Sequence, residues 1–263
     1  MYALGEPGRG LDRPEEVYCY LGYGGDVPQE RSMTSIAAVQ GLDHVIMIAD
    51  KKATQGDNGG YYTFSMEKLA VVNGKWVIGF AGTSIGRDLC DRIEKEGFRF
   101  SGDLERDVYK YADRMKDVYQ ECNYKGPAFL MLSGVHNDMP QTYTWSLNWD
   151  SGRREVLYEG AKRQSANAAI GANQHGALYL LNAYNDKRLT LDQRILLGYF
   201  TVAEVAKHDP RVGGPVEIAV MQGDKAPQLY VGEDGFKKLE VFRCESVRIS
   251  RLLSDSFLSF ARR

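Results

Sequence analysis

Residues 34–50 hold the stretch that decides the fold, TSIAAVQ at positions 34–40, then GLD at 41–43 and HVIMIAD at 44–50. Its two β-rich runs, Ile36–Val39 and Val45–Ala49, flank a glycine-containing turn, which predicts a pair of adjacent strands. A second pair is predicted at Leu69–Val72 and Trp76–Phe80, because Asn73-Gly74 between them is a strong hairpin signal.

The rest of the chain alternates between helical and strand patterns. Apolar residues three and four positions apart predict helices over 85–93 and 108–118. Thr190-x-x-Gln193 is a capping box, which predicts a helix from Leu191 to Lys207. The remaining predictions are strands at 128–132, 143–147, 155–158, 216–221 and 228–231, a helix around 177–183 after Gly171, and a closing helix near Glu233.

This order of elements predicts the α+β class. A four-layer αββα sandwich, with two antiparallel sheets between helix layers, would bury all the apolar stripes. Periodicity supports the class and does not by itself select this arrangement. Residues 1–33 are rich in Gly and Pro and lack a sustained period. We therefore expect a flexible extension, a propeptide or a mis-assigned start at 1–33, and one folded domain at 34–263.

Composition limits the classes of function. With 43% hydrophobic and 26% charged residues and a formal charge of −2, the chain is typical of a globular protein, and no nucleic-acid partner is expected. Its apolar runs are too short for a membrane span, and its first residues are too charged for a signal peptide. The widely spaced cysteines favour a reducing compartment, and the cytoplasm is the expected location.

Neither cysteine nor histidine spacing predicts a metal site. The four cysteines form no CxxC pair, and the four histidines show no ligand spacing. Cys90 and Cys122 lie at apolar positions of predicted helices and are expected to be buried thiols. No cofactor is expected.

Several segments, taken in order, resemble a known family. The stretch from Thr34 to Asp50 resembles the start of a mature proteasome β-type subunit and of the related bacterial two-component ATP-dependent peptidase, with the family's separation of 16 positions between nucleophile and aspartate. Lys68-Leu69 matches the catalytic lysine, after an insertion near residues 57–60. Gly79–Gly82 resembles the strand end that carries the oxyanion glycine, and 208–220 resembles the Asp-x-x-Ser-Gly-Gly segment. The resemblance runs from 33 to about 220 and implies an N-terminal nucleophile (Ntn) hydrolase fold.

The resemblance also implies a catalytic set, which is Thr34, Asp50, Lys68, Gly82 and Asp209. A threonine hydroxyl needs a base at hydrogen-bond distance. The α-amine of an N-terminal Thr34, with a reference pKa of about 7.7–8.0, could take its proton. The Lys68 cation would favour the neutral amine, Asp50 would orient Lys68, and the Gly82 N–H would face the developing oxyanion.

The same register places Phe80 as the floor of the substrate pocket, and Ala53 is a second expected substrate-binding residue. A floor at Phe80 would favour small uncharged side chains. The alternative for Phe80 is a core aromatic. The implied partners are further copies of the chain in a ring, an ATPase unfoldase, and a peptide or protein substrate.

Other interpretations stay open. Taken singly, Thr34 is an ordinary strand residue, and Asp50 and Lys68 are ordinary surface charges. Ala172 and Val212 stand where the family has serines that position the terminal amine. A non-catalytic proteasome-like subunit and an Ntn amidohydrolase for a small amide are therefore the two rivals to a threonine-type peptidase.

The start of the chain also departs from the family. Met33 precedes Thr34 where autocleaved proteasome subunits have glycine. Translation from Met33 followed by methionine removal would expose the amine of Thr34. If all 263 residues persist, that amine is capped and the site is inactive.

Overall fold

The computed structural model describes residues 34–57, 60–82, 84–101, 103–230 and 232–261. The extension expected at 1–33, Cys19 and the predicted strand end at Val231 lie outside these residues. Within them, the predicted α+β class with antiparallel sheets is confirmed.

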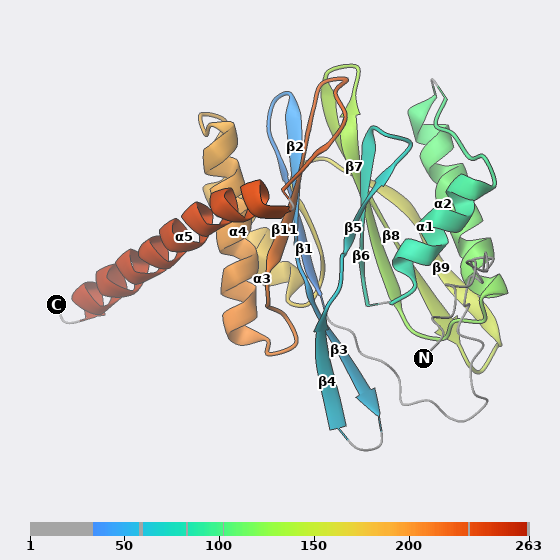
Figure 1. Cartoon of the computed structure of the whole chain (residues 1–263), viewed down its shortest axis with the longest axis horizontal. Coiled ribbons are helices and arrows are strands. Elements are labelled where there is room, and N and C mark those ends of the chain that lie inside the picture. Colours follow the sequence, from blue (N-terminus) through green and yellow to red (C-terminus); the bar gives the residue numbers. More distant parts are fainter. Residues whose placement is uncertain (1–33, 58–59, 83, 102, 231, 262–263) are drawn as a thin grey trace, which may run out of the picture.

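Two five-stranded antiparallel sheets form the centre of the described chain (Figure 1). The first, in spatial order β10-β1-β2-β11-β12, consists of Ala168–Gly171, Ser35–Gln40, His44–Asp50, Val216–Gln222 and Gln228–Tyr230. The second, in the order β5-β6-β7-β8-β9, consists of Leu69–Val72, Trp76–Ala81, Ala128–His136, Met139–Asp150 and Glu155–Gln164. Both hairpins predicted at the start of the domain are confirmed, since β1 pairs with β2 and β5 with β6.

Local chemistry explains the second hairpin. Asn73 and Gly74 have φ values of +50° and +68°, and the Lys75 N–H donates to the Val72 carbonyl oxygen at 3.3 Å, so they are the central residues of a β-turn. A turn with both central residues at positive φ matches the twist of the flanking strands. The predicted capping box is also present, because the Thr190 side chain accepts from the Gln193 N–H and the Gln193 side chain accepts from the Thr190 N–H. It starts α4, Leu191–His208.

Helices cover the outer faces of both sheets (Figure 1). The second sheet packs against α1, Gly86–Lys95, and α2, Leu104–Glu121, through a large apolar cluster. The first sheet packs against α3, Gln174–Tyr184, and α4. A separate apolar cluster joins the two sheets. The closing helix α5, Gly232–Ala261, begins against α4 and extends away from the sheets (Figure 1).

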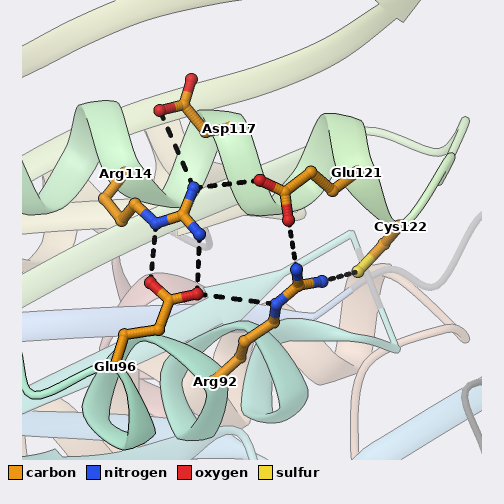
Figure 2. Close-up of polar contacts among 6 residues, drawn as sticks. All are labelled: Arg92, Glu96, Arg114, Asp117, Glu121 and Cys122. Carbon is orange, nitrogen blue, oxygen red and sulfur yellow. Dashed lines mark hydrogen bonds and ion pairs between the residues drawn. The ribbon is translucent and has the colours of Figure 1, made fainter.

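An ion-pair network joins α1 to α2 at the surface (Figure 2). The Arg114 guanidinium donates to both carboxylate oxygens of Glu96, at 2.7 and 2.6 Å, and to Glu121 at 3.1 Å. Arg92 donates to the other oxygen of Glu121. The two arginines thus share the two glutamates. This network links the end of α1 to α2 at the protein surface.

Three features differ from the sequence-based expectations. Asp57 and Gly60, at the bounds of the expected insertion, pair with each other in a hairpin of β3, Lys52–Asp57, and β4, Gly60–Ser65, which projects from the sheets (Figure 1). Strand β10 was not predicted. Cys90 is buried as expected, but the prediction for Cys122 is wrong: it is exposed, because α2 ends at Glu121 and Cys122 is its C-terminal cap, with its sulfur near Arg92 (Figure 2).

No helix in the described ranges combines the length and the apolar character needed to cross a membrane.

Candidate active site

Thr34 lies immediately before β1 and is fully buried. Its carbonyl oxygen accepts a hydrogen bond of 2.7 Å from the Ala172 N–H, at the end of the neighbouring strand β10. Its hydroxyl Oγ1 accepts a hydrogen bond from the Nζ atom of Lys68. These two contacts hold the main chain and the side chain of Thr34 from different elements.

Lys68, just before β5, is also fully buried and brings its ammonium to Thr34. Besides the Thr34 hydroxyl, Nζ donates to the carbonyl oxygen of Lys52 at 3.0 Å. Burial lowers the pKa of Lys68, and the negative charges of Asp50 and Glu217 oppose that shift. Desolvation is the larger effect, so this lysine loses its proton more readily than a lysine in water.

Asp50 is the last residue of β2 and is also fully buried. Its two carboxylate oxygens accept from the N–H groups of Ser35, at 2.9 Å, and Gly213, at 3.0 Å. Burial raises the pKa of Asp50, while the charge of Lys68 and the N–H donors oppose the shift. Because Ser35 follows Thr34 directly, Asp50 fixes the strand end that carries the hydroxyl.

Two glycines allow the close approach of the surrounding strands. Gly171 has φ +88°, and a Cβ there would overlap the carbonyl oxygen of Thr34 and lie 3.1 Å from Cβ of Ala81. Gly82, which follows Ala81, has φ +78°, and a Cβ there would lie 2.9 Å from the carbonyl oxygen of Pro127. Only glycine adopts such φ values without strain. The end of β6 is thereby brought to the start of β1.

The structure thus brings Thr34, Asp50 and Lys68 into one buried group, with Gly82 at the adjacent strand end. The catalytic roles expected for them remain predictions.

The other predicted residues lie outside this group. Asp209 follows α4, and its carboxylate binds the Arg211 guanidinium at 2.9 and 2.8 Å, which lowers the pKa of Asp209. Ala53 is buried on β3, next to the Lys52 carbonyl that accepts from Lys68. Phe80 is 1% exposed and belongs to the cluster beneath α1 and α2, with its ring against Gly86. Its assignment as a pocket floor stays a prediction.

Apolar side chains stand where the resembled family has serines. Ala172 and Val212 are each 3% exposed and share one cluster with Ala169, Ala177 and Val205. The residues that replace the hydroxyls therefore pack against one another.

Sequence reasoning missed Glu217, on β11. It is 5% exposed, and its Oε1 accepts from the N–H groups of Lys68 and of Leu69, the latter at 3.1 Å. Burial raises the pKa of Glu217 to about 7. A carboxylate inside the apolar run 216–221 was a signal in the sequence, because such a group is rarely buried without partners. In the part of the chain that the structure describes, no cluster of three or more His, Cys, Asp or Glu could hold a metal ion.

A scan of protein-family models gives no match, and no curated protein is similar enough in sequence to match. Among solved structures, the fold is similar to that of the Anbu (Gly-1) mutant from Hyphomicrobium sp. strain MC1. The TM-score is 0.63 and the identity 14%, over 85% of this chain and 96% of the other. That protein has the proteasome-like Ntn fold. The predicted resemblance is confirmed as a likeness of fold.

Proposed function

We propose that this protein is a threonine-type peptidase of the Ntn-hydrolase class with Thr34 as its nucleophile. The observation that carries the proposal is the hydrogen bond between Lys68 Nζ and Thr34 Oγ1 inside a buried site that also contains Asp50. A buried lysine with a lowered pKa beside a hydroxyl is an arrangement that activates a weak nucleophile.

In the proposed reaction the Thr34 hydroxyl proton passes to the α-amine of Thr34, directly or through the neutral amine of Lys68. Oγ1 then bonds to the carbonyl carbon of the substrate, and the Gly82 N–H stabilises the oxyanion. The peptide C–N bond breaks, the amine leaves with the proton, and water hydrolyses the ester. Asp209 would act indirectly, through the turn that contains Gly213, whose N–H binds Asp50.

The α-amine exists only if residues 1–33 are removed or never translated, so the working domain of the proposal is 34–263. Its fold would then be the four-layer αββα sandwich of Ntn hydrolases, a proposal supported by helices on the outer faces of two packed sheets. Intact-mass analysis of protein purified from its native host tests this. We expect a chain that begins at Thr34, and a stable N-terminus at Met1 would overturn the catalytic proposal.

The same proposal includes assembly into a homo-oligomeric ring, with an ATPase unfoldase as a possible partner and an unfolded peptide as substrate. Light scattering should then give several times the protomer mass of 29.5 kDa. A monomer at micromolar concentration would favour the small-amide rival instead.

One observation favours a second candidate, a non-catalytic subunit of a proteasome-like assembly. Ala172 and Val212 leave an apolar cluster where hydroxyls would position the amine. Hydrolysis of a fluorogenic peptide panel by protein that starts at Thr34 separates the two candidates. The peptidase should turn over a peptide that the Thr34→Ala variant leaves intact. Equal rates for both would favour the non-catalytic subunit.

A further inference from the structure

A glutamate from one sheet holds the main chain of the other sheet at the candidate site. Along β11, Ile218 packs toward the helices and Ala219 packs between the sheets. Because strand side chains alternate, Glu217 faces the second sheet together with Ala219. There its Oε1 accepts from the N–H groups of Lys68 and Leu69.

These two N–H groups belong to an edge of the second sheet. Strand β5 is the first strand in that sheet, so its outer N–H groups have no neighbouring strand to bind. The inner side is already fixed, since the Lys68 carbonyl oxygen accepts from the Phe80 N–H at 3.1 Å. Lys68 is therefore held from both sides, by β6 and by Glu217, at the point where its side chain turns toward Thr34.

The charges around Glu217 make it more than a structural acceptor. The negative charges of two carboxylates, Asp50 and Glu217, act on Lys68. Both raise the pKa of Lys68, whereas burial lowers it. Lys51 and Glu67 also act on Glu217, with opposite signs. Of the strands that pack against β11, β5 and β6 carry no titratable side chain, β7 carries His136, and β2 carries His44 and Asp50. Among these charges, those of Glu217 and Asp50 both act on Lys68.

We propose that Glu217 is a positioning residue of the candidate site: it fixes the main chain of Lys68 so that Nζ reaches Thr34, and its negative charge sets how readily Lys68 is protonated. The kinetic part of this inference rests on the proposed peptidase function. The electrostatic part does not.

Glu217→Gln tests the charge, because glutamine keeps an oxygen that can accept both N–H groups. The matched control is Glu94→Gln, which changes a carboxylate that accepts from the Asn73 N–H at 2.8 Å in the hairpin turn. In peptide hydrolysis above pH 7, where Glu217 is ionised, Glu217→Gln should move the rise of kcat/KM that reports Lys68 about one pH unit lower, as expected for loss of one nearby charge. Glu94→Gln should leave it in place. Glu217→Ala should lower kcat by at least tenfold with a smaller change in KM.

A second readout needs no turnover. In protein labelled at lysine Cε with carbon-13, the Lys68 resonance is assigned by its loss in Lys68→Arg, and its titration is followed by NMR. Glu217→Gln should lower the Lys68 midpoint by about one unit, and Glu94→Gln should not change it. An unchanged midpoint in Glu217→Gln would overturn the inference even if the protein cleaves peptides. A lowered midpoint without hydrolysis would support the inference and count against the peptidase instead.

Discussion

Replacing Lys68 by methionine separates chemistry from stability at the candidate site. Methionine keeps most of the buried volume and removes the hydrogen bonds from Nζ to Thr34 Oγ1 and to the Lys52 carbonyl oxygen. Each such bond contributes about 1 kcal/mol net, and the loss of a buried ammonium offsets part of that. We expect the free energy of unfolding to fall by about 1–2 kcal/mol.

The effect on turnover should be larger. A positioned proton-transfer group contributes about 10²- to 10⁴-fold to rate, which corresponds to about 3–5 kcal/mol in the activation free energy. Loss of rate should therefore exceed what the loss of stability explains. The same reasoning predicts that kcat falls more than KM changes, because Lys68 contacts the nucleophile.

The assay is kcat/KM on a fluorogenic peptide together with calorimetric unfolding, for Lys68→Met and for the surface control Lys75→Met. Lys75 is 55% exposed and pairs with Asp224, so its loss should change both quantities little. A Lys68→Met protein within threefold of wild-type kcat/KM, while Thr34→Ala is inactive, would refute the role of Lys68.

Three further outcomes concern stability. Gly171→Ala should destabilise the protein by about 2–5 kcal/mol, because its Cβ would overlap the Thr34 carbonyl oxygen. Gly74→Ala has the same sign of φ but open space around it, and should cost about 1 kcal/mol. Thermal unfolding measures both, and equal losses would contradict a steric clash at Gly171. Because the folded-state pKa of Glu217 is raised to about 7, its contribution to stability is fully present below pH 4.5 and is lost as pH rises through 7. Chemical denaturation should show wild type losing about 3 kcal/mol relative to Glu217→Gln over that range, and a constant difference would contradict the raised pKa. Arg114→Ala should cost about 0.5–1 kcal/mol and less at high salt, since its ion pairs are partly exposed; a cost independent of salt would contradict an electrostatic origin.

The sequence alone determined the elements whose signals are local. The turn at Asn73-Gly74 depends on the φ values that these two residues tolerate, and the start of α4 depends on Thr190 and Gln193, three positions apart. The α+β class followed from such local signals. The β3–β4 hairpin escaped prediction because the glycine-rich sequence near 57–60 was interpreted as an insertion. Cys122 was placed wrongly because the helical period was continued past the end of α2.

Only the tertiary structure decided which charges meet. Thr34, Asp50 and Lys68 could be selected from the sequence through a family resemblance, but the hydrogen bond between Lys68 and Thr34 depends on how the first sheet packs on the second. Glu217 and the Lys68 N–H are 149 residues apart and belong to different sheets. No local pattern encodes that distance, because the contact forms only when the apolar cluster between the sheets closes and leaves the carboxylate facing an unpaired strand edge.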